Sequence, residues 1–408
     1  MNMITSLVRL PSASWWIIFA GISAAMHVGK LAPAIQVFSN SFGVSLIESG
    51  FLLSTVQLVG MAFGLLVGLN VEGWGLRRSM FAGLLILSVA SILGSSFEDF
   101  RVLLMLRVVE GFGFLCVCMP APSMLIRLVR TGDLPVMLGL WGCYMPFGVG
   151  AALLLGPWII DVSSWEIWWA GIGLISLVAA YGVWNNTAVD LNLSSKVSIK
   201  SKIGNTLYKT LSQSGPWFVA ISFALYSGQW LAVIGFLPFL YLQSGSFGLW
   251  VGPLTALVAA INMVGNAASG AFLKRGFKAQ TLLMWAFGTM ATATFFAFGS
   301  YPNLTSYPGV RYFSILIFSA VGGVIPGTLF FMAVQLAPSE DTVATTVGWA
   351  QQWSSMGQFL GPPLVAWVAT SQGGWQWTWW ITGLMGIMGI YMARKIGDLV
   401  ALKGAKGN

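Results

Sequence analysis

The chain has 408 residues, of which 57% are hydrophobic and only 8% are charged, and its formal net charge is +8. Because an average soluble domain carries about 25% charged residues, this composition excludes an ordinary soluble protein and indicates one embedded in lipid. The lysines and arginines lie between apolar runs and form no basic face, which excludes nucleic acid as a partner.

Twelve apolar runs follow one another along the chain, and each is close to the length of about 20 residues that a helix needs to cross a bilayer. They predict an all-α membrane protein with 12 transmembrane helices. The first run follows Arg9 but is too long for a signal peptide, so we count it as a transmembrane helix. The expected helices are 14–38, 46–69, 77–97, 101–126, 136–160, 166–184, 215–242, 247–272, 279–299, 311–337, 343–370 and 376–394.

The lysines and arginines outside these helices are distributed unevenly between the two sides. If the N-terminus is cytoplasmic, the cytoplasmic segments hold 16 of them and the outer segments hold only Arg101 and Arg311. Cytoplasmic loops of membrane proteins are rich in Lys and Arg. We therefore expect a multi-pass protein of the plasma (inner) membrane with both termini in the cytoplasm.

A short pattern recurs in the two halves of the chain. Pro33 and Pro238, which are about 205 residues apart, each begin the pattern P-x5-S-x-S-F-G. The recurrence predicts two pseudo-symmetric six-helix bundles, 1–184 and 215–408, joined by a basic cytoplasmic linker at 185–214. Many secondary transporters are built from two such halves and bind their substrate between them.

The segment after the second run reads GLNVEGWGLRR. It resembles the G-x-x-x-D-R-x-G-R-R-R signature of the major facilitator superfamily (MFS), and the resemblance covers essentially the whole chain. A carboxylate can pair with arginines near a helix end, so we expect a conformational latch here. The alternative is that the arginines only hold a short loop inside. The residues of the predicted latch are Gly68, Glu72, Gly75, Arg77 and Arg78.

Three further segments resemble the same family. The fourth run contains RVVEGFGF, starting at Arg107, which is similar to the R-x-x-Q/E-G-x-G segment. The eleventh run has G-x8-G-x3-G-P, from Gly348 to Pro362, a pattern that antiporters of the family carry in the fifth helix. The fifth run of this chain keeps only the glycine pair Gly139 and Gly148, and its WGCYMPFGVG segment resembles the cyanate- and nitrate-type anion porters.

Four ionisable residues, Lys30, Arg107, Glu110 and the only histidine, His27, lie inside the predicted helices. An ionised side chain at the centre of a membrane helix costs roughly 2.5–3.5 kcal/mol on insertion scales, and such residues usually mark a transport pathway. The excess of positive charge predicts a substrate site for a small anion, with Lys30 and Arg107 as counter-ions and His27 beside them. The alternative is an internal network that ties the two helices together. His27 and Glu110 are the candidate proton carriers, because histidine titrates near neutral pH.

Uncharged polar and aromatic residues complete the predicted substrate site. Amide side chains can orient a bound solute by hydrogen bonds, although they also join transmembrane helices to one another. The same two interpretations, ligand contact and packing, apply to the aromatic side chains. The candidates are Tyr144, Gln229, Trp230, Asn262, Asn266, Gln351, Gln352 and Trp353.

These features predict a secondary active transporter that moves a small anionic solute by alternating access, with proton-coupled uptake. The alternative within transport is proton-coupled efflux of a drug or metabolite, and the alternative of another class is a channel or a non-transporting membrane sensor. We expect no enzyme activity, because one histidine and scattered acids supply no catalytic cluster. We also expect no cofactor, no metal site, and a monomer whose partners are the solute, protons and the lipid bilayer.

Overall fold

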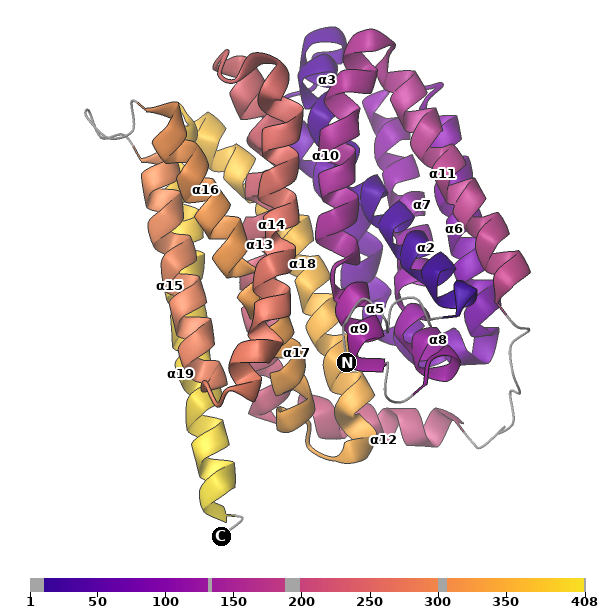
Figure 1. Cartoon of the computed structure of the whole chain (residues 1–408), viewed down its shortest axis with the longest axis vertical. Coiled ribbons are helices and arrows are strands. Elements are labelled where there is room, and N and C mark those ends of the chain that lie inside the picture. The colour runs from indigo at the N-terminus through magenta and orange to yellow at the C-terminus, as the bar shows by residue number, and fades with distance from the viewer. Residues whose placement is uncertain (1–10, 131–133, 188–198, 300–306, 407–408) are drawn as a thin grey trace.

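The computed structural model describes residues 11–130, 134–187, 199–299 and 307–406. These residues form α-helices joined by turns and short 3-10 segments, and they contain no β-strand. Ten of the helical segments are long and apolar enough to cross a membrane. Two further long helices, α18 (Val343–Ser371) and α19 (Trp379–Lys406), run beside them (Figure 1). The predicted all-α membrane fold is confirmed, and the long helical segments match the twelve predicted in order.

The helices of the first part of the chain lie together on the right side of Figure 1. Several predicted transmembrane helices consist of two consecutive shorter helices. The elements are α2 (Ser12–Gly29), α3 (Ile35–Phe42), α4 (Leu46–Ser54), α5 (Leu58–Trp74), α6 (Leu76–Gly94), α7 (Phe100–Cys118), α8 (Ala121–Leu128), α9 (Leu134–Gly142), α10 (Tyr144–Val162) and α11 (Trp165–Asn186).

The helices after α12 lie together on the left side of Figure 1, and α12 (Ile199–Leu211) crosses the lower end of the molecule. We call this lower end the α12 end and the opposite one the far end. Of the predicted linker 185–214, residues 188–198 lie outside the described part of the chain. The remaining elements are α13 (Ser214–Gln243), α14 (Val251–Lys274), α15 (Ala279–Phe298), α16 (Pro308–Gly322), α17 (Val324–Leu336), α18 and α19.

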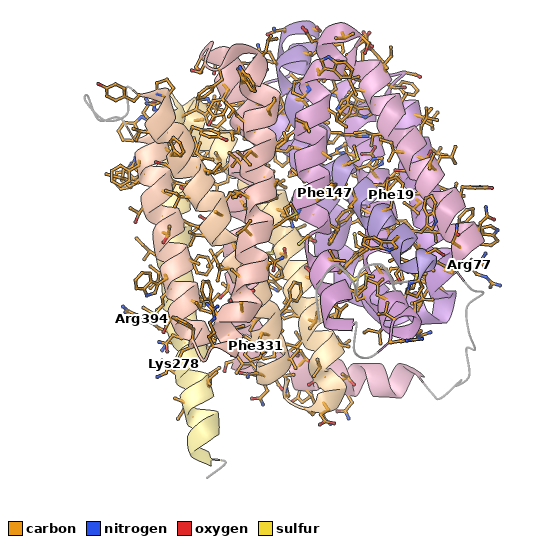
Figure 2. All side chains as sticks on the ribbon, viewed as in Figure 1. Phe19, Arg77, Phe147, Lys278, Phe331 and Arg394 are labelled. Carbon is orange, nitrogen blue, oxygen red and sulfur yellow. The ribbon has the colours of Figure 1, made fainter. Side chains whose placement is uncertain are left out.

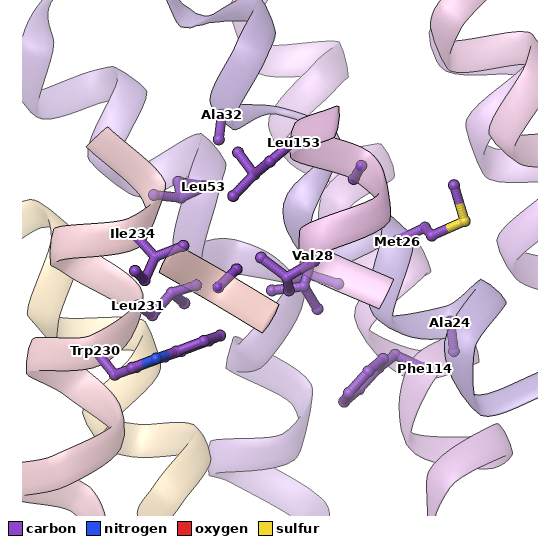
Figure 3. Close-up of a cluster of buried hydrophobic side chains, with 14 of the residues drawn as sticks. Ala24, Met26, Val28, Ala32, Leu53, Phe114, Leu153, Trp230, Leu231 and Ile234 are labelled. Atoms are coloured by element: carbon purple, nitrogen blue, oxygen red, sulfur yellow. The ribbon is translucent and has the colours of Figure 1, made fainter. Parts of the chain in front are cut away.

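Buried apolar side chains of the two groups of helices meet in one continuous core. Figure 3 shows part of it, with Leu53 of α4 near Ile234 of α13. A Cβ atom at Gly235 would meet the end of the Leu53 side chain, so the Leu53 side chain of α4 packs closely against α13. Because lipid is as apolar as these side chains, close packing rather than removal of surface from water holds such helices together.

Four predicted transmembrane helices are interrupted near a proline, among them 14–38 at Pro33 and 101–126 at Pro120. Proline donates no backbone hydrogen bond, which frees the carbonyl four residues earlier. The run predicted at 136–160 divides into α9 and α10 ahead of Pro146, and the freed carbonyl of Gly142 accepts a hydrogen bond from Asn266 Nδ2 of α14 at 3.0 Å. The run predicted at 311–337 likewise divides into α16 and α17.

The surface of the molecule is largely apolar on its flanks. Trp285 and Tyr181 are more than 70% exposed, and many other large apolar side chains point outward (Figure 2). Water would not tolerate so much exposed apolar surface, but lipid does. The labelled cations Arg77, Lys278 and Arg394 lie toward the α12 end in the same view. This end faces the cytoplasm in the predicted topology.

Candidate functional site

A cavity of about 140 Å³ lies between the two groups of helices. Its size is close to that of the engineered cavity of about 150 Å³ that holds benzene, so it suits a small solute. The first group of helices contributes Gln57, Phe114, Leu115, Cys118, Met119, Trp141, Gly142, Tyr144, Met145 and Pro146. The second group contributes Phe223, Tyr226, Ser227, Trp230, Asn262, Asn266, Pro326, Phe330, Gln351, Ser354, Ser355 and Gln358.

The wall of this cavity is aromatic and polar but carries no fixed charge. Within the described part of the chain, no Lys, Arg, His, Asp or Glu side chain lines it. Aromatic walls with a few polar groups are typical of sites for small molecules. The predicted site residues that the structure places in the wall are Tyr144, Trp230, Asn262, Asn266 and Gln351.

Several polar groups of the wall already have partners inside the protein. Asn262 Nδ2 donates to the carbonyl oxygen of Ser319 at 2.9 Å, and the Asn262 amide also lies within hydrogen-bond distance of the Tyr226 hydroxyl. Trp230 Nε1 donates to Ser319 Oγ at 3.1 Å. These bonds join α13, α14 and α16, so this side of the cavity is held rigid without a bound solute.

A separate cluster of charged side chains lies inside the first group of helices. Glu110 of α7 forms ion pairs with Lys30, directly after α2, and with Arg107, whose Nη1 is 2.7 Å from Glu110 Oε2. Lys30 Nζ also donates to Ser91 Oγ of α6 at 2.7 Å and lies 4.5 Å from the centre of the Trp169 ring. The side chains of the three charged residues are at most 2% exposed. One carboxylate therefore serves two buried cations.

His27 extends this cluster through a chain of hydrogen bonds. Its Nδ1 is 3.3 Å from Glu110 Oε1, its Nε2 is 2.8 Å from Ser176 Oγ, and that oxygen is 2.8 Å from Ser23 Oγ. A carboxylate only accepts, so we assign neutral His27 as donating from Nδ1 and accepting from Ser176 at Nε2. If His27 gains a proton, Nε2 becomes a donor and the Ser176 hydroxyl must turn toward Ser23. The chain can thus exist in two hydrogen-bond directions.

Arg107 also binds backbone carbonyls where two helices end. Its guanidinium donates to the carbonyl oxygens of His27 at 2.6 Å, Leu52 at 3.0 Å and Leu53 at 3.4 Å. Carbonyls in the last turn of a helix have no partner further along the helix and carry partial negative charge. The five donors of an arginine can serve several such acceptors at once. Arg107 therefore ties α7 to the ends of α2 and α4.

The charged cluster lies outside the cavity wall. Phe114 and Leu115, one turn after Glu110 on α7, are the α7 side chains that begin the wall. The structure therefore brings the predicted ionisable residues together with one another, and it separates them from the predicted aromatic and amide residues. With Glu110 ionised and His27 neutral, Lys30 and Arg107 leave the cluster with a net charge of +1.

Gln352 lies at the contact between the two groups of helices. Its Nε2 donates to the carbonyl oxygen of Met61 at 2.7 Å, and its Oε1 accepts from the amide of Leu65 at 3.0 Å. Met61 and Leu65 are four residues apart on α5 and would otherwise bond to each other along the helix. The glutamine amide therefore bonds to both the carbonyl and the amide of one turn of α5.

Two other predicted candidates lie in neither the cavity wall nor the charged cluster. Gln229 is fully buried, and its Nε2 donates to the carbonyl oxygen of Leu225 one turn earlier at 3.0 Å. Trp353 packs edge to face with Trp217, with ring centres 5.6 Å apart. In this conformation both side chains serve packing within the second group of helices.

Arg77, a member of the predicted latch, contacts α11. It lies over the Trp184 ring, 4.2 Å from its centre, and donates to the carbonyl oxygen of Trp184. Gly75 precedes α6 with φ +92°, a backbone conformation that glycine adopts without strain. This segment thus joins the start of α6 to the last turns of α11.

The other latch residues are less informative. The side chain of Glu72 lies outside the described part of the structure, so the predicted pairing of this carboxylate with the arginines stays a prediction. Gly68 lies in α5, where an added Cβ would be 3.5 Å from Met119 Sδ. Arg78 is exposed on α6.

Sequence analysis missed two glutamines of the cavity wall. Gln57 ends the 3-10 turn between α4 and α5 and is 1% exposed, and Gln358 of α18 is 8% exposed. Gln358 follows Gln351 by seven residues, a spacing that places both on one face of a helix. That spacing is a signal in the sequence that could have found Gln358, whereas Gln57 has no comparable partner nearby.

The fold and the cavity together define a membrane transporter. A sequence model of the Major Facilitator Superfamily matches residues 17–357. The chain therefore belongs to this superfamily, and the resemblance read from its motifs is confirmed. The members of the family are transporters rather than enzymes.

Known proteins similar to this chain are named for different substrates. The cyanate transport protein CynX of Escherichia coli (strain K12) is 27% identical over 257 residues, a match that spans 60% of this chain and only 60% of that protein. The multidrug efflux protein YfmO of Bacillus subtilis (strain 168) is 22% identical over 90% of this chain and 88% of its own length. The crystal structure of a D-xylose-proton symporter superposes with a TM-score of 0.70 over 96% of this chain and 97% of that chain at 16% identity, which supports the fold alone.

Proposed function

We propose that this protein is a secondary active transporter that binds one small solute in the cavity between its two groups of helices and opens the cavity alternately to the two faces of the membrane. The observation that carries the proposal is the cavity itself, because helices of both groups line it. Rocking of one group against the other would expose such a site first to one side and then to the other.

Contacts between the two groups of helices lie on both sides of the cavity, as alternating access requires. Toward the α12 end the contacts are polar, with Gln352 bonded to α5 and Asn266 bonded to the carbonyl of Gly142. Toward the far end they are close apolar contacts, and a Cβ at Gly150 of α10 would lie 3.8 Å from that of Ala259 on α14. Each set could separate while the other stays closed.

We further propose that proton binding at the charged cluster is coupled to this motion. A histidine changes its charge near neutral pH, and a proton on His27 would reverse its hydrogen bond to Ser176. Arg107 connects the cluster to the ends of α2 and α4, and α4 touches α18 where Gly50 meets Pro363. A change of charge at the cluster would thus act on helices at the contact between the two groups.

The uncharged wall favours a solute without net charge. Desolvating an ion in a cavity with no opposite charge is costly, whereas aromatic walls bind an apolar body without that cost. A neutral solute with an apolar body also suits the efflux alternative, and one relative is named a multidrug efflux protein. Uptake and efflux would use the same cavity and differ only in the gradient that drives them.

A small anion is the second candidate. Two observations favour it: the net charge of +1 on the buried cluster, and the similarity to a protein named as a cyanate transporter. This candidate requires Lys30 or Arg107 to reach the solute in another conformation. An increase in thermal stability with cyanate in the wild type, lost in Lys30→Met, would support it.

Distances between spin labels test the proposed motion. In a variant without the native cysteines, one label pair at Arg130→Cys and Lys274→Cys reports the α12 end, and another at Ser163→Cys and Ser244→Cys reports the far end; all four residues are exposed. When the pH is lowered from about 8 to about 4, a range wide enough to protonate a buried histidine, one distance is expected to lengthen while the other shortens. Two distances that stay constant, or that lengthen together, would contradict alternating access coupled to protons.

A further inference from the structure

Two side chains of the cavity wall contain polar atoms that no other group of the protein satisfies. Gln57 Nε2 and Gln358 Oε1 are buried and have no hydrogen-bond partner. In the described part of the chain, no other cavity-lining residue has such an atom. A buried donor or acceptor without a partner costs free energy, which a solute that pairs with it would recover.

The two glutamines lie at the same level on facing helices of the two groups. The rings of Phe51 and Phe359 are 6.3 Å apart, and a Cβ at Gly60 would lie 2.5 Å from Ser355 Oγ. The segment from α4 to α5 therefore runs antiparallel to α18, and residue numbers that rise on one side fall on the other. Gln57 and Gln358 lie between these two contacts. Both side chains line the cavity, and their unpartnered atoms are covered in this conformation, so a head group that binds both must turn each amide toward itself.

The unpartnered atoms have opposite hydrogen-bonding roles. The amide nitrogen of Gln57 is a donor and needs an acceptor, whereas the amide oxygen of Gln358 is an acceptor and needs a donor. We assign the Gln358 amide with its nitrogen donating to Ser354 Oγ, 3.3 Å away, which leaves its oxygen as the free acceptor. A carboxylate offers no donor and an ammonium group offers no acceptor, so neither ion satisfies both glutamines.

We infer that the solute carries an uncharged head group that accepts a hydrogen bond from Gln57 and donates one to Gln358, as a carboxamide, urea or lactam does. This inference rests on the proposed function of the cavity as the substrate site. Because the two glutamines belong to different groups of helices, the head group bonds to both groups at once. The same bonds that recognise the solute thereby favour closing the cavity around it.

The rest of the wall determines what the head group is attached to. Trp141 and Tyr144 stack on each other with ring centres 4.4 Å apart, and Phe114 and Trp230 lie on other helices of the wall. Flat aromatic faces around a cavity of about 140 Å³ suit one planar ring or an apolar chain of similar size. Benzamide is therefore a suitable probe for the full solute class.

Binding of three probes of the same shape tests the inference. The full-length protein in detergent is titrated with benzamide, with benzoate, which is an anion, and with acetophenone, which only accepts, and the apparent melting temperature is followed. Benzamide is expected to bind about tenfold more tightly than either of the others, because only benzamide satisfies both glutamines. This comparison needs no variant and is unaffected by any folding defect.

Three matched substitutions then locate the effect. Gln57→Met and Gln358→Met keep the side-chain length and remove the amide, and each is expected to weaken benzamide binding about tenfold. Gln229→Met is the control, because Gln229 is also a fully buried glutamine with an unpartnered oxygen but lies outside the cavity wall. It should leave benzamide binding unchanged.

Three outcomes would overturn the inference. They are benzoate binding more tightly than benzamide, no benzamide binding at millimolar concentration, and unchanged benzamide affinity in both cavity variants. The last would mean that the glutamines only join α18 to the α4–α5 segment. Tighter binding of benzoate would rule out the uncharged head group but leave the transport proposal intact, because that proposal is tested by the spin-label distances and not by the affinity for these probes.

Discussion

Arg107 contacts more partners than a single ion pair requires. Its guanidinium reaches the Glu110 carboxylate and the carbonyl oxygens of His27, Leu52 and Leu53. Lysine has one ammonium group and could not reach acceptors spread over three helices. The planar guanidinium of arginine, with its several donors, is therefore required at this position. In this state the residue holds helix ends together, whatever part it takes in binding a solute.

Replacing Arg107 should therefore destabilise the protein. Arg107→Met leaves three carbonyls without this donor and removes one of the two cations paired with Glu110. Breaking a buried pair in this way costs roughly 3–5 kcal/mol in the free energy of unfolding, measurable by denaturation in mixed micelles. Arg107→Lys should recover only part of the loss. Arg311→Met, at an exposed arginine, is the control, and an Arg107→Met protein as stable as this control would contradict the assigned role.

Single residues could be predicted from the sequence only in part. The i, i+3 spacing of His27 with Lys30 and of Arg107 with Glu110 correctly indicated that each pair shares a helix face. The internal network, stated as the alternative, is the arrangement found, with Glu110 paired to both cations. The sequence could not say that Phe114 and Leu115 rather than Glu110 would reach the cavity. Those facts depend on how α7 is rotated against its neighbours, which residue spacing alone does not determine.

At the scale of elements, glycines determine how closely the helices cross. A Cβ at Gly148 of α10 would lie 2.5 Å from the carbonyl oxygen of Ile22 on α2. A Cβ at Gly357 of α18 would collide with the carbonyl of Ala224 on α13. The matched glycines of the fifth and eleventh predicted helices thus make corresponding backbone contacts. Close helix packing therefore explains the glycine pattern that resembles a family motif.

Two of the three glycines of the α18 motif, Gly357 and Gly348, should respond differently to alanine. At Gly357 the new methyl group meets the backbone of Ala224, which cannot move aside, whereas at Gly348 the nearest atom is Leu65 Cδ1 at 3.2 Å, the end of a flexible side chain. Gly357→Ala is expected to lower the free energy of unfolding by about 1–3 kcal/mol, the usual cost of overpacking. Gly348→Ala is expected to change it little. Equal effects in thermal unfolding would argue against close packing as the reason for the motif.

The order and limits of the long helices could be predicted well, and the prolines pointed to interruptions but not to whether each helix would bend or divide. Apolar length alone gives each run, because crossing lipid requires it. Whether a proline bends a helix or divides it depends on whether a neighbour can satisfy the freed carbonyl. At Pro146 that neighbour is Asn266, more than a hundred residues further along the chain, so the division between α9 and α10 depends on a tertiary contact.

At the scale of the whole molecule, the two ends differ in chemistry. The groups of helices meet through side-chain hydrogen bonds of Gln352 and Asn266 toward the α12 end and through small residues such as Gly150 and Gly235 toward the far end. Hydrogen bonds of this kind contribute about 0.6 kcal/mol each between membrane helices. Because these energies are small, a solute that binds both groups could readily shift the equilibrium between the state closed at the α12 end and the state closed at the far end.

The recurring sequence patterns predicted a molecule of two similar halves, but they did not predict which side chains would line the cavity between them. A repeat indicates that two similar units face each other and that a site lies between them. Which side chains meet there depends on the faces that the units turn toward each other. Hence Gln229 and Gln352 were expected in the site but lie outside its wall, while Gln57 and Gln358 were not expected and line it.

The most direct test of alternating access uses Cys118, which lines the cavity and is a free cysteine. With the other two cysteines replaced by alanine, a disulfide is introduced at either end. Gly64→Cys with Gln352→Cys locks the α12 end, and Gly150→Cys with Ala259→Cys locks the far end. The Cβ separations at these two pairs are 3.4 Å and 3.8 Å, close to the value of about 3.8 Å found in disulfides.

The measurement is the rate at which a membrane-impermeant maleimide modifies Cys118 when it is added to one face of oriented vesicles. With the α12 end locked, Cys118 should react only from the far face, and with the far end locked only from the α12 face; reduction of each disulfide should restore reaction from both. Reaction from both faces while a lock is closed, or from neither face in the unlocked protein, would contradict a carrier that works by alternating access.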